Sequence, residues 1–515
     1  MTNAYDAVVV GAGPNGLSAA IRLAEADLSV LLVEAEDRIG GAVKTDELTL
    51  PGFLHDTYSS VYPAGAASPV FARMPLEEHG LRFVHPRVAV SHVLDGGRGA
   101  SLYKDLDQTA DSLDSLHRGD GAGWKDFISP YVENWDVLQK AMMEGFPPVW
   151  GGLRAALRLG YQGSLETGRV LLQPATALAD ELFSSDGAKA WLYGTAIHGD
   201  VAPDAAGSAV FGFYLNLLGH VVGWPVAEGG SGRFARALAG YFESLGGQIR
   251  VGCPVERISA QNGRVRGVIV AGEEFRTGLA VCDVTPHGLL NLSGHLLPDS
   301  YKKKMARFRY GPGSLKLDYA LSGPVPWEYP AAQGAGTLHI GGGTRELEES
   351  ISREKLGYLP EKPFLLAAQP SVADSSRAPE GRHTFWAYTH VPHGVDWEKR
   401  AEEHADRMEA QIERFAPGFK DLVLGRHVIT PVDLENKNRN LVGGDVNAGS
   451  QAPDQLFFRP LPALSPYRTP LRGLYIGSAS TFPGGAVHGV PGDAAARCAL
   501  TDLKVRRIKD LVPRG

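Results

Sequence analysis

Cysteine is scarce in this 515-residue sequence, and a surplus of positive charge is missing. The three cysteines, Cys253, Cys282 and Cys498, lie far apart and form no C-x-x-C motif. This excludes a disulfide framework and a dithiol redox centre, and favours a reducing, cytoplasmic environment. The formal net charge is −7 and no Lys/Arg-rich run is present, so a nucleic-acid partner is not expected. The first residues lack the pattern of a signal peptide.

One segment, residues 205–227, contains no Asp, Glu, Lys or Arg and is long enough to span a bilayer. It contains Asn216, His220, Pro225 and four glycines. In a helix that spans a bilayer, their polar groups would face lipid without hydrogen-bond partners. We therefore expect a buried helix. A chain of this length exceeds one hydrophobic core, so two or three packed lobes are expected.

A dinucleotide-binding signature opens the chain. An apolar run at residues 7–10 predicts a strand buried on both faces, and a helical pattern follows. A second apolar strand, residues 30–33, ends on Glu34, whose carboxylate suits ribose hydroxyls. Between the first strand and the helix lies a G-x-G-x-x-G motif made of Gly11, Gly13, Pro14, Asn15 and Gly16. Its glycines permit a tight turn, a close approach to pyrophosphate and close packing of helix on strand.

The residues after Glu34 resemble the second FAD motif of the flavin amine oxidase superfamily. The members of this motif are Ala35, Arg38, Gly40, Gly41 and Ala42. The two glycines would let backbone N–H groups approach the pyrophosphate from the opposite side, and Arg38 would add a cation. Ala42 stands where that superfamily usually has a second Arg, which is typical of its phytoene-desaturase-like branch.

The C-terminal part carries the same resemblance. Residues 473–478 predict a buried strand with a glycine stop, and residues 493–500 an Ala-rich helix whose N-terminus would point at the flavin. From residue 443 onward the sequence resembles phytoene-desaturase-like proteins named for a pyridine nucleotide-disulphide oxidoreductase domain, although it has no disulfide motif. The resemblance implies FAD contacts at Val255, Gly477, Ser478, Val487 and His488. It also implies non-covalent FAD, because covalent forms use a Cys near the last helix and none precedes Cys498 there.

These features predict an α/β protein with a discontinuous Rossmann-type FAD-binding domain, an α+β substrate domain and a helical insertion. The expected segments are FAD-binding at 1–101, a helical insertion at 102–223, FAD-binding at 224–287, a mixed-sheet substrate domain at 288–440, FAD-binding at 441–510, and a segment 511–515 that resembles the remnant of a tag.

Three residues are candidates for catalysis. Lys316 alternates with Asp318 along a predicted strand, and a similar strand in flavin amine oxidases places a Lys that holds a water at flavin N5. The alternative is a solvated strand Lys. His488 lies where the flavin ring is expected, and the alternative is a capping or space-filling His. Asp56 ends the segment 52–56, which resembles the segment beside the flavin in this superfamily.

The sequence favours an FAD-dependent dehydrogenase or oxidase that transfers hydride from an apolar, polyene or lipid-like substrate, with O₂ or a quinone as the acceptor. An amine oxidase using Lys316 and a flavin-binding scaffolding protein are the alternatives. No metal site is expected, because Pro392 breaks any helix that would align His390 with His393. A weak membrane contact through Arg154 and Arg158 stays open, as does a homodimer.

Overall fold

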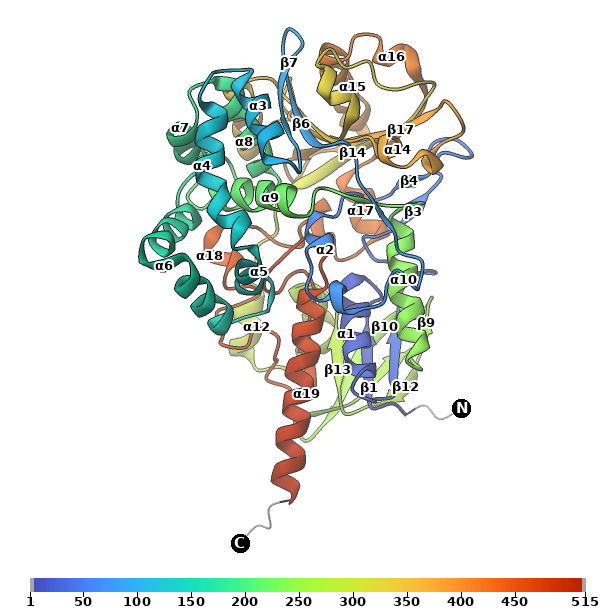
Figure 1. The fold of residues 1–515 in the computed structure, drawn as a ribbon. Helices are drawn as coiled ribbons and strands as arrows, with labels where there is room; N and C mark the ends of the chain where they lie inside the picture. The colour runs from blue at the N-terminus through green and yellow to red at the C-terminus, as the bar shows by residue number, and fades with distance from the viewer. Residues whose placement is uncertain (1–3, 512–515) are drawn as a thin grey trace.

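A parallel sheet forms the base of the molecule (Figure 1). The computed structural model describes residues 4–511, so nearly all of the expected tag remnant lies outside the described residues. The strand order is β19-β13-β1-β2-β9. The strands are β1 Ala7–Val10, β2 Val30–Val33, β9 Gln248–Arg250, β13 Ala280–Cys282 and β19 Leu474–Ile476. They come from distant parts of the sequence, which confirms a discontinuous α/β fold.

Helices cover this sheet where their small residues permit close packing. Helix α1 (Pro14–Ala24) begins with Pro at its first position, which suits a helix start. Helix α19 (Val490–Leu511) packs on α1, and a Cβ on Gly492 would lie only 1.8 Å from the Asn15 carbonyl oxygen. Helix α10 (Ser231–Ser244) also contacts α1. The N-termini of α1 and α19 therefore meet at one edge of the sheet.

A three-stranded antiparallel sheet lies beside the parallel sheet. It consists of β10 (Val255–Gln261), β11 (Arg264–Val270) and β12 (Glu273–Arg276). The sequence pattern predicts one strand over residues 249–258, and this expectation is wrong. Gly252 has a φ of 63° and Pro254 follows it, so the chain turns there and β9 and β10 join different sheets.

A seven-stranded sheet forms the second lobe, in the order β18-β14-β17-β16-β15-β6-β7. Its strands are β6 Val88–Leu94, β7 Arg98–Leu102, β14 Gly313–Leu321, β15 Ala335–Ile340, β16 Leu365–Ala368, β17 His383–Val391 and β18 Val423–Ile429. The expected boundary at residue 101 assigns β6 and β7 to the first FAD-binding segment. They belong instead to this sheet, because β6 pairs with β15 from Ala335 to Ile340.

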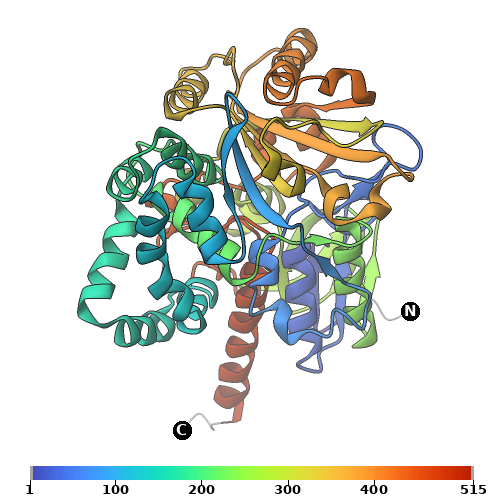
Figure 2. The ribbon, with the colours of Figure 1, turned by 45° about the horizontal axis from the view of Figure 1, so that its top comes forward.

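The helical lobe lies on one side of the molecule and contacts the seven-stranded sheet (Figure 2). Its helices are α3 Leu106–Asp114, α4 Asp120–Glu133, α5 Trp135–Met143, α6 Val149–Leu172, α7 Ala175–Leu182, α8 Asp186–Ile197 and α9 Ala209–Val221. Helix α9 lies within the uncharged segment 205–227 and is mostly buried, as predicted. Within residues 4–511, no helix is both long and apolar enough to cross a membrane.

A buried ion pair joins the two lobes at strand β4 (His55–Asp56). The Arg377 guanidinium, which belongs to the second lobe, donates to Asp56 at 2.9 Å and to Asp374 at 2.8 Å. The other Asp56 oxygen accepts from the Ser231 backbone N–H at the start of α10, at 2.7 Å. Burial alone would raise the pKa of Asp56, but Arg377 and the hydrogen bonds from Ser60 and Ser231 hold that pKa below its usual value.

Replacing Arg377 with Met would leave two carboxylates without their cation. We expect Arg377→Met to lower the free energy of unfolding by about 3–5 kcal/mol, because removing one partner of a buried pair leaves an uncompensated charge. Urea denaturation of the holoprotein measures this change. The matched control is Arg382→Met, at an exposed position, and an equal effect of both variants would contradict the role given to Arg377.

Candidate functional site

One cavity of about 1230 Å³ extends from the glycine-rich turn after β1 to the seven-stranded sheet. Most of the site residues predicted from the sequence line it. Those lining residues are Gly11, Gly13, Pro14, Asn15, Glu34, Ala35, Gly41, Ala42, Val255, Lys316, Ser478, Val487 and His488. The structure thus brings together residues that lie up to 477 positions apart in the sequence, from Gly11 to His488.

Two glycine turns form the cradle at one end of the cavity. A Cβ on Gly41 would lie 2.9 Å from the Gly13 Cα, and a Cβ on Gly16 would lie 1.9 Å from the Gly11 carbonyl oxygen. The Gly16 contact lets α1 pack closely on the preceding turn, and the Gly41 contact brings the two glycine turns together at the start of α1, where a helix N-terminus suits an anion. Gly40 and Gly477 lie outside the cavity lining and serve the packing around it. The cradle therefore fits a pyrophosphate group.

Glu34 is held rigidly at the end of β2. Its carboxylate accepts from the Ala12 backbone N–H at 2.7 Å and from the Glu36 N–H at 3.0 Å. Each oxygen keeps a lone pair, so the carboxylate can also accept from ribose hydroxyls. Arg38 differs from the expectation, since it lies outside the cavity lining and pairs with Asp46 at 2.6 Å.

Sequence reasoning missed Asp283, which directly follows β13. Its carboxylate lines the cavity and accepts from the Gly16 N–H at 2.9 Å. Burial, together with nearby Glu34, raises the pKa of Asp283 to about 7. Its position could have been found, because the carboxyl ends of parallel strands meet at the ligand-binding edge of such a sheet.

Lys316 lies on the cavity-facing side of β14. Its side chain is only about 6% exposed, so the interpretation as a solvated strand Lys is wrong. The ammonium group donates to Asp318 and to the Asp56 backbone carbonyl at 3.1 Å, and it lies 5.5 Å from the Trp386 ring centroid. Burial raises the pKa of Asp318 to about 6, although Lys316 opposes that shift.

The other two catalytic candidates are held by neighbouring groups. The His488 ring lines the cavity, but its Nε2 faces the Gly485 carbonyl at 3.1 Å and its Nδ1 accepts from the Val490 N–H at 3.2 Å. Burial lowers the pKa of His488 to about 4. These contacts favour the capping role for a neutral ring. Asp56 is fully buried outside the cavity lining, so the structure assigns it to the junction between the lobes.

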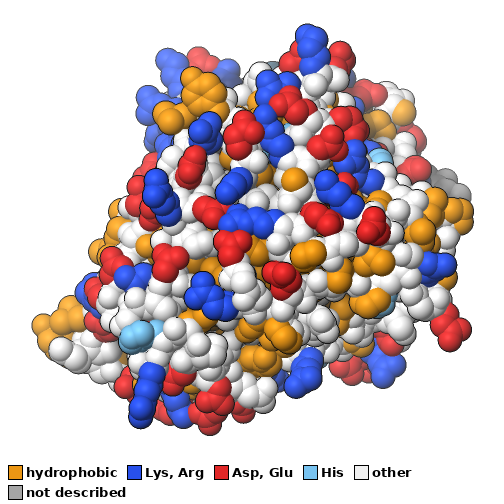
Figure 3. Space-filling view, turned by 90° about the horizontal axis from the view of Figure 1, so that it is seen from above, with side chains coloured by type: hydrophobic (Ala, Val, Ile, Leu, Met, Phe, Trp, Pro, Cys, Tyr) orange, Lys and Arg blue, Asp and Glu red, His pale blue; other side chains and the backbone are white. Residues whose placement is uncertain are grey.

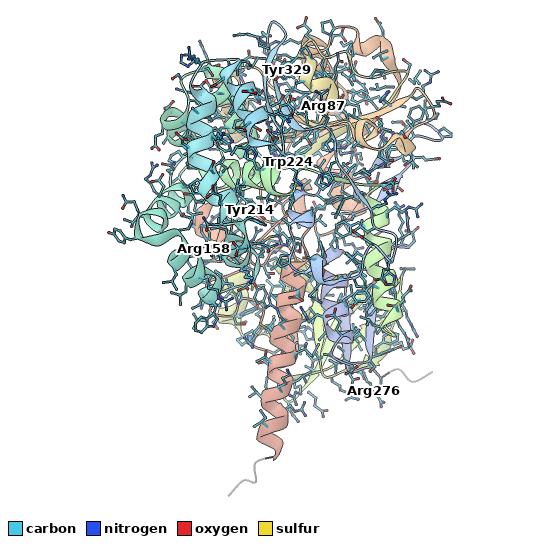
Figure 4. The ribbon with its side chains drawn as sticks, viewed as in Figure 1. Arg87, Arg158, Tyr214, Trp224, Arg276 and Tyr329 are labelled. Atoms are coloured by element: carbon cyan, nitrogen blue, oxygen red, sulfur yellow. The ribbon has the colours of Figure 1, made fainter. Side chains whose placement is uncertain are left out.

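The far end of the cavity has two different walls. We call the cavity-facing side chains of the seven-stranded sheet the sheet floor; they are Ser314, Lys316, Thr337, Leu366, Trp386 and Tyr388. We call the lining residues of α5, α6 and α9 the helical wall, which includes Leu138, Met142, Ala155, Leu159, Leu171, Phe213 and Tyr214. Figure 4 shows Tyr214 and Trp224, both lining residues, in the middle of the molecule. The site is thus polar on one side and apolar on the other.

Asp283 should make FAD binding depend on pH. A neutral carboxyl tolerates the adjacent diphosphate, whereas an ionised one repels it, so affinity should fall as pH rises through about 7. We expect the dissociation constant to rise about fivefold or more from pH 6 to pH 8, and to stay flat in Asp283→Asn. Quenching of flavin fluorescence by the apoprotein measures it. The control Asp37→Asn, at an exposed position, should keep the native slope, and a native slope in Asp283→Asn would contradict this assignment.

Comparison with known proteins agrees with this geometry. The flavin containing amine oxidoreductase family matches residues 15–498. The rat pyridine nucleotide-disulfide oxidoreductase domain-containing protein 2 is 30% identical, over 97% of this chain and 94% of that protein. A lycopene-forming phytoene desaturase from a Paracoccus species is 25% identical, over 97% and 98% of the two chains. An oxidoreductase from Methanosarcina mazei has a similar fold, with a TM-score of 0.65 over 96% of this chain and 99% of that chain, at 17% identity.

The matched family spans nearly the whole chain, and the similar proteins include a phytoene desaturase that aligns with almost its full length. The expectations of FAD as the cofactor and of oxidoreductase activity are thereby confirmed. This chain is a member of the flavin containing amine oxidoreductase family and an FAD-dependent oxidoreductase.

Proposed function

We propose that the protein is a dehydrogenase or oxidase that removes hydride from an apolar substrate bound between the sheet floor and the helical wall. The observation that carries this proposal is the continuity of the cavity. The same cavity contains the dinucleotide cradle at one end and the largely apolar helical wall at the other. A substrate on the sheet floor would therefore lie against the flavin end of a dinucleotide bound at Glu34.

Bound FAD supplies the hydride acceptor, and the chain supplies orientation, charge and exclusion of water. Lys316 keeps a fixed positive charge at the sheet floor, because Asp318 and the Asp56 carbonyl hold its ammonium group. The N-terminus of α19 adds a partial positive charge near Val487 and His488. These groups favour negative charge at the flavin end of the cavity. O₂ or a quinone is the proposed final acceptor. We propose that FAD is held non-covalently, since Cys498 lies outside the cavity lining and Cys253, which lines the cavity, lies at the cradle end, where its N–H donates to the Glu34 carbonyl oxygen.

An amine substrate fits the site less well. No acidic side chain is present among the residues that make up the sheet floor, and the nearby Asp318 carboxylate is already paired with Lys316, so an ammonium group would gain no carboxylate partner there. The segment before α19 contributes Gly485, Ala486 and Val487 to the cavity, which are too small to enclose an amine. The apolar substrate is therefore the better supported of the two.

Removing the Lys316 charge tests its role in flavin reoxidation. Lys316→Met alone would leave Asp318 buried without its cation, so the double variant with Asp318→Asn is the sharper test. We expect reoxidation by O₂ to slow by about tenfold or more, since one decade corresponds to about 1.4 kcal/mol, while FAD content stays native. Stopped-flow absorbance of the reduced enzyme measures the rate.

The control for that experiment is Lys304→Met, which removes an exposed charge from α12 (Asp299–Met305). Native reoxidation in the double variant would contradict the role given to Lys316. Such a result would favour a quinone over O₂ as the acceptor.

We further propose that helix α6 contacts an anionic lipid bilayer. Gly160, with a φ of 71° and a ψ of −177°, breaks this helix into two parts, and large apolar side chains are exposed on both. Trp150 and Leu157 before the break are exposed by 70% and 77%, and Tyr161 after it by 80%. Residues 149–165 include Arg154 and Arg158 but no acidic residue, which suits anionic headgroups. Its inward face lines the cavity through residues such as Ala155, Leu159 and Leu171. An apolar substrate could therefore pass from the bilayer into the cavity along this helix.

The surface seen from above differs from this exposed part of α6. Figure 3 shows the side seen from above, where Lys, Arg, Asp and Glu side chains alternate over the surface. In Figure 4, Arg158 lies in the helical lobe, where its guanidinium donates to the Asn134 side-chain oxygen at 3.0 Å. The exposed apolar residues Trp150, Leu157 and Tyr161 of α6 therefore form a local surface. Basic residues lie beside them, as expected of a helix that lies on a membrane surface.

Vesicle flotation tests the α6 contact. Vesicles of phosphatidylcholine and phosphatidylglycerol should bind the native protein, and the double variant Leu157→Glu/Tyr161→Glu should bind at least about tenfold more weakly. Leu356→Glu is the control, because Leu356 is also exposed, by 73%, but lies outside α6. Failure of the native protein to float would contradict the proposal. A native dimer that the α6 variant disrupts would assign this face to a second copy instead.

A further inference from the structure

Three polar atoms on the sheet floor lack partners. They are Ser314 Oγ, Thr337 Oγ1 and Trp386 Nε1, and none of them has a hydrogen-bond partner among the residues that the structure describes. All three side chains are more than nine-tenths buried and line the cavity. Buried polar atoms of this kind are uncommon, because each loses its contact with water without compensation.

Strand register places these atoms on one face around Lys316. Ser314 lies two residues before Lys316 on β14, so the two side chains share a face. Trp386 on β17 pairs with Asp318, and its ring lies against the Lys316 ammonium group. Thr337 on β15 belongs to the same row, because both it and Trp386 pair with Ala368 of β16. Three strands therefore contribute hydrogen-bonding groups to one surface.

The charge on this surface is already balanced. The Lys316 ammonium group pairs with the Asp318 carboxylate beneath it, so a ligand on the sheet floor gains little from a formal charge of its own. A hydroxyl can donate or accept, whereas the Trp386 N–H can only donate. Ser314 pairs with His390, four residues from Trp386 along β17, and Thr337 lies two strands away from Trp386, so one ligand atom cannot reach all three groups. Each of them can bond a neutral oxygen, and the helical wall of the same cavity accommodates a hydrocarbon body.

We propose that the sheet floor binds the carbonyl or hydroxyl oxygen of an otherwise apolar substrate. This inference rests on the proposed function, since it takes the cavity as the substrate site, and it narrows the substrate class from hydrocarbons to oxygen-bearing apolar molecules. A site built to bond a substrate oxygen discriminates strongly against an analogue without it, because the protein groups are then left unpaired. Ser314, Thr337 and Trp386 thus determine specificity.

Binding of matched probes to the FAD-loaded protein tests this inference. We would use two pairs of probes, limonene with carvone and farnesene with farnesal. In each pair a hydrocarbon is matched with an oxygen-bearing molecule of the same carbon skeleton. The perturbation of flavin absorbance on titration gives the affinity without any turnover. We expect the oxygen-bearing member of at least one pair to bind at least about tenfold more tightly than its hydrocarbon. Because each probe carries one oxygen, either Thr337→Val or Ser314→Ala, whichever removes the hydroxyl that bonds the probe, should reduce that preference severalfold, and neither variant should weaken hydrocarbon binding.

The control variant is Thr384→Val. Thr384 is on β17, buried, and its hydroxyl also lacks a partner among the described residues, but it lies outside the cavity lining. It should therefore keep the native preference. The proposal is overturned if neither oxygen-bearing probe binds, if the hydrocarbons bind equally well, or if both the Thr337 and the Ser314 variants keep the native preference, as the Thr384 variant should. Oxygen-selective binding without flavin reduction would support this inference and contradict only the proposed hydride removal.

Discussion

The Asp56–Arg377 ion pair is the constraint on which the rest of the structure depends. Neither side chain is exposed, and the pair connects the chain segment after the dinucleotide cradle with the second lobe. The same Asp56 residue caps the start of α10 through its carboxylate and accepts from Lys316 through its backbone carbonyl. Because one residue fixes both a helix and the cavity ammonium group, the relative position of the two lobes sets the position of Lys316.

This arrangement places the dinucleotide cradle and the proposed substrate site at different ends of one cavity. At the cradle, carboxylates and backbone N–H groups select a dinucleotide, and Glu34 and Asp283 are positioned by hydrogen bonds to the glycine-rich turn. At the far end, a mostly apolar wall faces a sheet that carries a few polar atoms. Apolar lining with a few placed polar groups is the usual composition of a small-molecule site.

The sequence could predict the parts of the site that depend on local chain geometry. Glu34 and the glycines follow from a strand, a turn and a helix contiguous in sequence, and Lys316 follows from alternation along one strand. Trp386 and Thr337 could not be predicted, since their common face depends on pairing through β16 between distant strands. Arg38 was misplaced because its partner, Asp46, lies eight positions further along the chain, and pairing there was not visible in the motif. The arrangement of side chains on the sheet floor therefore depends on the register between distant strands, which the sequence alone does not show.

The adjacency of β19 to β13, and of α19 to α1, has a consequence for biosynthesis. Strand β19 and the first turns of α19 are translated after the other strands and helices of both lobes, yet they complete both the parallel sheet and the flavin end of the cavity. A nascent chain that has already formed β1 and α1 lacks the Gly492 contact with Asn15 until residues beyond 490 leave the ribosome. Enclosure of the cofactor must therefore follow the synthesis of these residues, and premature termination near residue 470 would yield a product with a glycine-rich turn but no enclosed flavin site.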